Sequence, residues 1–304
     1  MSSITFEGRV AMITGAGGGL GRQHALLLAS RGAKVVVNDL GGAVDGHGAS
    51  AGPAQQVVDE IIAAGGEAVA DTNSVSTDDG AAAIVQTALD TFGRVDIVVN
   101  NAGIIRDKSF AKMTPELWDP VVAVHLRGAY CVTRAAWPHL RQQNYGRVIC
   151  TTSAAGLFGN FGQANYSAAK MGLVGLTRVL AHEGAPNNIK ANAIAPVART
   201  RMTEDLLGSL ADKLDPSLVS PLVAFLASDD CSVTGEIYSI GGGRVARIFL
   251  AECAGHFDPN LSPEAIRDHL AEISAEDGSS TPTRASDEIK LMLRSMDSAR
   301  AERT

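Results

Sequence analysis

The feature of this sequence that most constrains its fold is the alternation of short apolar, β-branched runs with helical segments. Strands buried on both faces of a parallel sheet read as nearly continuous Val, Ile and Leu runs. Because parallel neighbours need crossover helices, the alternation predicts right-handed βαβ units and an α/β fold with a doubly wound parallel sheet. Six runs fit this interpretation: residues 9–14, 33–39, 95–101, 146–153, 189–196 and 236–243.

Two segments depart from the alternation. Residues 41–56 are a Gly/Ala-rich stretch that we expect to form an unusually long loop. After Gly243 the alternation stops, and a polar linker joins a capped helix over 262–273 to a further apolar stretch over 288–296. The sequence therefore predicts a main domain over 1–243 and a helical C-terminal extension over 244–304.

Composition excludes several classes of function. The formal charge of −7 and the 5% aromatic content argue against a nucleic-acid partner, and no apolar run is long enough to span a membrane. The N-terminus enters a predicted strand at once, so we expect no signal peptide. The histidines show no metal-binding spacing, which predicts no metal site. The scattered cysteines predict reduced, mostly buried thiols in a cytoplasmic protein: Cys131, Cys150, Cys231 and Cys253.

A glycine-rich segment follows the first predicted strand. Gly15, Gly19 and Gly21 lie between this strand and a helix that closes at Gly32, with Leu20 among them. Glycines at such a turn let the backbone approach a pyrophosphate, which then lies at the helix N-terminus. A turn that binds no ligand would show the same pattern, but its place at the start of the chain favours a dinucleotide site.

The ends of later strands carry further candidates for cofactor binding. Asp39 ends the second strand, where a carboxylate can accept both hydroxyls of an adenosine ribose and would repel a 2′-phosphate; this favours NAD over NADP, although an Asp can also cap a turn. By spacing, Ser74 and Val75 can flank the adenine. Asn101, Ala102 and Gly103 follow the fourth strand, and an Asn there can hold either the cofactor or the loop backbone.

Tyr166 and Lys170 lie four residues apart in a segment of small residues. Positions i and i+4 share one helix face, so the two head groups can meet. A cation beside a phenol lowers the pKa of the phenol and makes it usable as an acid and base near neutral pH. A packed Tyr and a solvated Lys on an ordinary helix would show the same spacing.

Taken in order, these segments resemble the short-chain dehydrogenase/reductases, whose fold is the Rossmann fold. The resemblance rests on residues 14–21, 100–103, Ser153, 166–170 and 194–196, and covers residues 6–243. Longer stretches resemble the (3R)-hydroxyacyl-CoA dehydrogenase unit of peroxisomal multifunctional enzymes type 2. They include residues 159–170 and the extension after Gly243, which suggests a stand-alone, bacterial relative.

The resemblance implies a mechanism and a set of roles. Tyr166 would be the acid and base, Lys170 would tune it and bind the nicotinamide ribose, and Ser153 would hold the substrate oxygen. Pro196, Ala198 and Thr200 would contact the cofactor. His125 stands where most of the family has an Asn, and can hydrogen-bond water or a backbone carbonyl or simply pack.

The resemblance implies an NAD-dependent oxidoreductase of secondary alcohols, with (3R)-3-hydroxyacyl-CoA as the leading substrate. A hydroxysteroid dehydrogenase of the 17β type is the main alternative. NADPH-dependent 3-oxoacyl reduction is disfavoured by Asp39, and a non-catalytic dinucleotide sensor is disfavoured because Tyr166 and Lys170 are both present. The resemblance also implies a homodimer formed by the helix carrying Tyr166 and a long helix from near Trp118.

The extension contains enough apolar residues to pack against a protein surface rather than remain disordered. Two interpretations of the extension remain open. In the first, it is a structural addition that packs on the protein or on its dimer. In the second, it covers the substrate cleft, either of its own subunit or of the partner.

Overall fold

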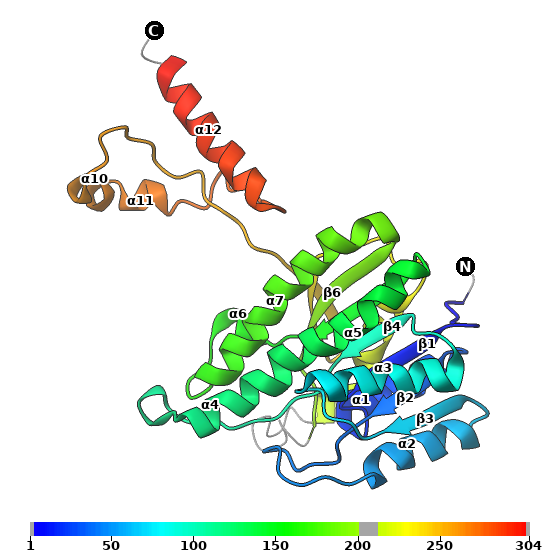
Figure 1. The fold of residues 1–304 in the computed structure, drawn as a ribbon. Helices are drawn as coiled ribbons and strands as arrows, with labels where there is room; N and C mark the ends of the chain where they lie inside the picture. The colour runs from blue at the N-terminus through cyan, green and yellow to red at the C-terminus, as the bar shows by residue number, and fades with distance from the viewer. Residues whose placement is uncertain (1–2, 201–211, 302–304) are drawn as a thin grey trace. The chain divides into compact units, whose positions relative to one another are not determined.

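The structure, a computed structural model, describes residues 3–200 and 212–301. Within these ranges the chain forms an eight-stranded sheet and its covering helices (Figure 1). The strands are β1 Val10–Thr14, β2 Lys34–Asn38, β3 Glu67–Asp71, β4 Ile97–Asn100, β5 Gly146–Thr151, β6 Ile189–Pro196, β7 Ile237–Gly241 and β8 Arg244–Ile248. The helices of the main domain are α1 Gly19–Ser30, α2 Gly52–Ala63, α3 Asp78–Phe92, α4 Pro115–Val122, α5 Gly128–Gln142, α6 Ala154–Phe158, α7 Ala164–Gly184 and α9 Ser220–Ala227.

The strand order is β3-β2-β1-β4-β5-β6-β7-β8, and every pair from β3 to β7 is parallel. This confirms the predicted α/β fold with a doubly wound parallel sheet. The order reverses beside β1, whose neighbours are β2 and β4. In such sheets ligands bind at the carboxyl ends of the strands near this reversal.

The core divides into two layers because successive strand residues face opposite sides of the sheet. Ala11 and Ile13 of β1 pack, together with Val35 and Val37 of β2, into a cluster formed with α1, α2 and α9. The alternate residues face the other side, where α3, α5 and α7 lie in front of the sheet in Figure 1. Both faces are therefore covered, as the apolar strand sequences predict.

The structure differs from the sequence prediction in three places. The predicted loop over 41–56 ends earlier, since α2 begins at Gly52. The predicted long helix from Trp118 is α4, a π-helical turn η2 over Ala123–Arg127, and α5. Finally, β8 extends the sheet beyond Gly243; a two-residue connection, Gly242 and Gly243, joins it to β7 and requires the two strands to be antiparallel.

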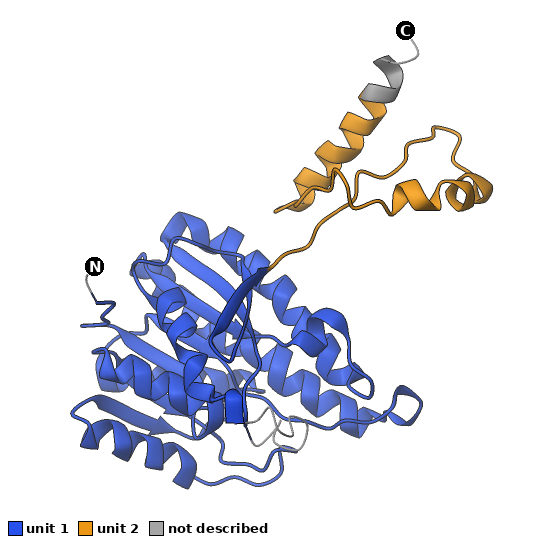
Figure 2. Ribbon diagram, turned by 180° about the vertical axis from the view of Figure 1, so that it is seen from behind, with its two compact units in different colours: residues 1–247 blue, residues 248–304 orange. Residues whose placement is uncertain are grey.

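Two compact units make up the chain, over 1–247 and 248–304 (Figure 2). The division lies a few residues beyond the predicted one, because β8 belongs almost entirely to the first unit. The second unit contains α10 Pro263–Asp268, α11 Leu270–Ile273 and α12 Ala285–Ala301. Ser262 caps α10 as predicted, with its Oγ accepting from the Ala265 N–H at 3.0 Å.

The cysteines and the helix lengths bear on two predictions made from composition. Cys131, Cys150 and Cys231 are free and buried, and Cys253 is free and half-buried, which confirms the predicted pattern of thiol burial. Among the residues that the structure describes, no helix combines the length and apolar character that a membrane crossing requires.

Candidate active site

A cavity of about 600 Å³ lies at the carboxyl ends of the central strands. All but one of the residues predicted from the sequence line it. They are Gly15, Gly19, Leu20, Asp39, Ser74, Val75, Asn101, Ala102, Gly103, Ser153, Tyr166, Lys170, Pro196, Ala198 and Thr200. Only Gly21 of the predicted set lies outside this lining.

At the turn from β1 into α1, Gly15 and Gly21 are required for different structural reasons. Gly15 has a φ of +64°, and a Cβ there would lie 2.8 Å from the Ala102 Cα, so no side chain fits. A Cβ at Gly21 would lie 2.3 Å from the Gly15 carbonyl oxygen, so this glycine permits close helix–strand packing. Within the described chain no side chain caps the N-terminus of α1, which leaves its first N–H groups for an anion. This arrangement fits a pyrophosphate.

Asn101 fastens the glycine loop to the neighbouring strand end. Its Nδ2 donates to the carbonyl oxygens of Thr14 and Gly15 at 3.0 and 3.1 Å. In return, Thr14 Oγ1 accepts from the N–H groups of Asn101 and Ala102, both at 3.1 Å. The side chain of Asn101 is thus engaged by the loop backbone, which is one of the two roles that the sequence left open.

Asp39 lies at the end of β2 with both carboxylate oxygens engaged by backbone amides. Oδ2 accepts from the Gly17 N–H at 2.8 Å, and Oδ1 accepts from the Gly41 N–H at 2.7 Å. Each carboxylate oxygen can accept a further hydrogen bond. The side chain is therefore held in place at the cavity wall with capacity for two ribose hydroxyls.

A polar network behind Asp39 holds the segment that carries Ser74 and Val75. Asn38 Nδ2 donates to Asp71 Oδ1 at 2.7 Å and to the Asn73 carbonyl oxygen at 2.9 Å. This network fixes the segment after β3 beside the end of β2, and both predicted residues line the cavity there.

Tyr166 and Lys170 share one face of α7 and both line the cavity. The Lys170 Nζ lies 5.4 Å from the centroid of the Tyr166 ring and donates to the Thr151 carbonyl oxygen at 2.5 Å. Lys170 is only 3% exposed, and burial lowers its pKa to about 7.

The pKa of Tyr166 differs from the sequence prediction. In the polypeptide by itself, burial of the phenol raises this pKa, a hydrogen bond with Ser153 lowers it, and the charge of Asp107 raises it. The net direction is upward, because desolvation disfavours the phenolate and the neighbouring ammonium is itself desolvated. The spacing of Tyr166 and Lys170 predicted their proximity correctly, but it did not reveal the effect of burial.

Ser153 follows β5 and begins α6. Its Oγ accepts from the Ala155 N–H at 3.2 Å, as an N-cap residue does. The Ser153 side chain also lowers the pKa of Tyr166, and both residues line the cavity, where they could share one substrate oxygen.

Two residues outside the predicted set fix the start of α7. Asn165 Nδ2 donates to the carbonyl oxygens of Arg106 and Leu117 at 2.9 and 2.8 Å, and Gln163 Nε2 donates to Asp107 Oδ2 at 2.7 Å. Asn165 and Gln163 are buried. They position the Tyr166 backbone, and because their partners lie over forty residues away, no local pattern could have identified them.

His125 lies on the π-helical turn η2, buried against the catalytic candidates. Its Nε2 is 2.8 Å from the Ile104 carbonyl oxygen and 3.0 Å from the Ile104 nitrogen. Its ring meets the Tyr166 ring edge-on, with centroids 5.1 Å apart. Burial, and then the charge of Lys170, hold the pKa of His125 well below its usual range, so the imidazole is neutral.

Comparison with known proteins agrees with this geometry. Residues 9–208 match the family model for short chain dehydrogenases. A short-chain type dehydrogenase/reductase of Mycobacterium tuberculosis is 56% identical over 270 residues, which cover 88% of this chain and 94% of the relative. A hydroxyacyl-CoA dehydrogenase of the same organism is 39% identical and covers 89% of this chain and 91% of its own length.

The structure of full-length peroxisomal multifunctional enzyme type 2 from Drosophila melanogaster superimposes with a TM-score of 0.82 at 37% identity. The match covers 97% of this chain but 50% of the Drosophila chain, so this protein spans half the length of that relative. The family implies an NAD(P) dinucleotide as cofactor, which the glycine loop and Asp39 fit. This chain is a short-chain dehydrogenase/reductase enzyme, related to the dehydrogenase unit of peroxisomal multifunctional enzyme type 2.

Proposed function

We propose that this enzyme is an NAD-dependent (3R)-3-hydroxyacyl-CoA dehydrogenase that interconverts the alcohol with the 3-oxoacyl ketone. The observation that carries the reaction type is the convergence of Ser153, Tyr166 and Lys170 on one cavity beside the glycine loop. The substrate class is supported by the relationship to a hydroxyacyl-CoA dehydrogenase and to the multifunctional enzymes.

The choice of NAD rests on Asp39. Its carboxylate is held by the Gly17 and Gly41 amides at the cavity wall, where a ribose hydroxyl can donate to it. A phosphate on that ribose would bring two like charges together in a partly enclosed site, which is unfavourable.

The chain's own residues supply binding and proton transfer. Ser153 donates a hydrogen bond to the substrate oxygen and thereby orients it toward Tyr166. In the oxidation the Tyr166 phenolate takes the proton of the alcohol, and in the reduction the Tyr166 hydroxyl donates its proton to the ketone oxygen. Lys170 is fixed by the Thr151 carbonyl oxygen. When its amine is protonated, the positive charge favours the phenolate form of Tyr166. A bound nicotinamide supplies the hydride acceptor or donor.

A turnover panel tests this proposal. Purified enzyme is given NAD or NADP with a (3R)-3-hydroxyacyl-CoA, its (3S) isomer and a 17β-hydroxysteroid, and kcat/KM is measured for each pair. We expect the (3R) thioester with NAD to exceed the other combinations by at least tenfold. Higher kcat/KM for the steroid would contradict the acyl-CoA assignment while leaving the reaction type intact.

The free, mostly buried cysteines support a reducing compartment. We therefore propose the cytoplasm as the location of the enzyme.

A further inference from the structure

The second unit lacks a hydrophobic core of its own. None of residues 248–297 is buried, and several large apolar side chains of the unit, including Leu270 and Met292, are more than half exposed. Units of this size generally need a disulfide, a metal ion or a partner to be stable. The sequence of this unit contains one cysteine, Cys253, so a disulfide within it is excluded.

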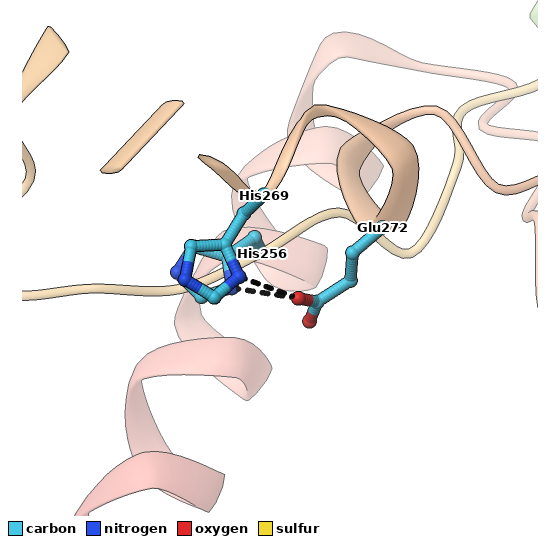
Figure 3. A group of neighbouring side chains, drawn as sticks. All are labelled: His256, His269 and Glu272. Atoms are coloured by element: carbon cyan, nitrogen blue, oxygen red, sulfur yellow. Dashed lines mark hydrogen bonds and ion pairs between the residues drawn. The ribbon is translucent and has the colours of Figure 1, made fainter. Parts of the chain in front are cut away.

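Three side chains with metal-ligating atoms meet in this unit (Figure 3). His256 lies before α10, His269 lies immediately before α11, and Glu272 is in α11. The Nδ1 atoms of both histidines are 3.1 Å from the same carboxylate oxygen of Glu272. The two imidazole rings stack with centroids 3.9 Å apart.

The spacing of the donor atoms suits a small tetrahedral ion. All three lie within 4.8 Å of one another. A tetrahedral ion with ligand distances of about 2.0–2.1 Å places its donor atoms roughly 3.3 Å apart, close to the two nitrogen–oxygen distances of 3.1 Å. Two imidazoles and one carboxylate are a typical zinc ligand set, whereas Mg²⁺ and Ca²⁺ prefer sites made of oxygen.

We propose that His256, His269 and Glu272 bind one divalent transition metal ion, for which Zn²⁺ is the best match, and that the ion fastens the segment before α10 to α11. The exposed fractions of the His269 and Glu272 side chains are 45% and 56%, which leaves room for water as a fourth ligand. Binding requires each histidine to carry its remaining proton on Nε2 and to turn its ring so that both Nδ1 lone pairs converge.

The spacing of the histidines predicted no metal site because it matches no characteristic motif. The loop after His256 and helix α10 bring His256 and His269 together, and one helical turn brings His269 and Glu272 together. The proposed site involves none of the residues assigned to the active site, so it stands independently of the proposed substrate.

The test uses the full-length chain without a polyhistidine tag, stripped with a chelator and titrated with ZnCl₂ in a calorimeter. We expect one ion per chain, and at least tenfold weaker binding after His256→Gln or Glu272→Gln. Three matched controls should bind as the wild type does: His182→Gln and Glu276→Gln, which replace exposed residues of the same types, and Cys253→Ser, which removes the unit's thiol.

Two further measurements report on the coordination geometry of the ion and on whether the ion fastens the segment before α10 to α11. Co²⁺ in place of Zn²⁺ should give the intense visible absorption of a four-coordinate ion, and this absorption should be lost in His256→Gln. Hydrogen exchange of residues 256–273 should slow on adding Zn²⁺ to the wild type but not to the variant. Failure of the wild type to bind saturably, or equal affinity in the wild type and both ligand variants, would overturn the proposal and show that Glu272 only accepts two imidazole hydrogen bonds.

Discussion

The Nζ of Lys170 is anchored to the carbonyl oxygen of Thr151 at 2.5 Å while it lies 5.4 Å from the centre of the Tyr166 ring. The lysine is thus fixed to the end of β5 and presents its charge to the phenol through space. Because burial opposes that charge, the protonation of Lys170 is linked to folding and should be measurable.

Lys170 should make stability depend on pH between neutral and alkaline conditions. Its pKa is about 7 in the folded chain and near its ordinary value of 10.5 after unfolding, so the unfolded state binds more protons across this interval. The free energy of unfolding should therefore rise with pH from 7 to 9, by at most about 1.4 kcal/mol per pH unit. Urea titrations of the wild type and Lys170→Met, without added cofactor, measure the rise, which should be smaller in the variant. Identical slopes would show that Lys170 remains protonated in the fold.

Tyr166→Phe should abolish proton transfer while preserving the fold. The substitution removes only the phenol hydroxyl, so cofactor affinity should stay within about twofold while kcat falls by at least about 10²-fold. Steady-state kinetics and a cofactor titration provide both values, and Tyr238→Phe on β7 serves as the matched control. A Tyr166→Phe enzyme with most of its kcat would assign the proton to another group.

Asp39 should set the preference for NAD over NADP. We expect NAD to bind at least tenfold more tightly than NADP, a difference of about 1.4 kcal/mol in binding free energy. Asp39→Asn should narrow this difference in affinity because the substitution removes the negative charge but keeps one oxygen acceptor. Calorimetric titration of both cofactors into the variant, the wild type and the exposed control Asp45→Asn measures this. Equal affinities in the wild type would refute the assignment.

The sequence predicted most of the fold and most of the candidate residues that line the cavity, because their signals are local. Buried parallel strands are readable as apolar runs, and the glycine loop, Asp39 and the Tyr166–Lys170 pair follow from fixed positions within single elements. The features that could not be predicted from the sequence depend on tertiary contacts. The partners of Asn165 lie in the segments around Arg106 and Leu117, and the upward pKa shift of Tyr166 comes from burial. The π-helical turn under His125 has no simple sequence signal.

Homodimerisation through α5 and α7 remains a prediction, supported by apolar side chains exposed on both helices. Tyr130 on α5 is 45% exposed and Val179 on α7 is 51% exposed. We expect sedimentation at micromolar concentration to give twice the chain mass of 31.5 kDa. Val179→Arg should weaken the dimer because it would bury a charge at the contact, whereas Ile62→Arg on α2 should not. A monomeric wild type would contradict the prediction.

A chain that ends at Ile248 should test the role of the second unit. This end point keeps β8, whereas ending at Gly243 would remove a strand of the sheet. If the extension covers the substrate cleft, KM for a bulky thioester should rise at least tenfold while KM for a small alcohol changes little. Thermal unfolding and kinetics with both substrates distinguish the covering role from a purely structural one. A purely structural extension, when removed, would lower the stability of the protein and change KM for both substrates alike. An unchanged KM for the bulky substrate would rule out the covering role.

The position of β8 also bears on solubility during synthesis and storage. A sheet edge with unpaired backbone groups can recruit strands from other molecules, and short, charged edge strands prevent this. β8 is five residues long and carries exposed Arg244 and Arg247, the latter paired with Glu236 at 2.5 Å. Strand addition by a second copy at this edge would bring like charges together. The short, charged edge at β8 therefore disfavours the addition of strands from other copies of the chain on this side of the sheet.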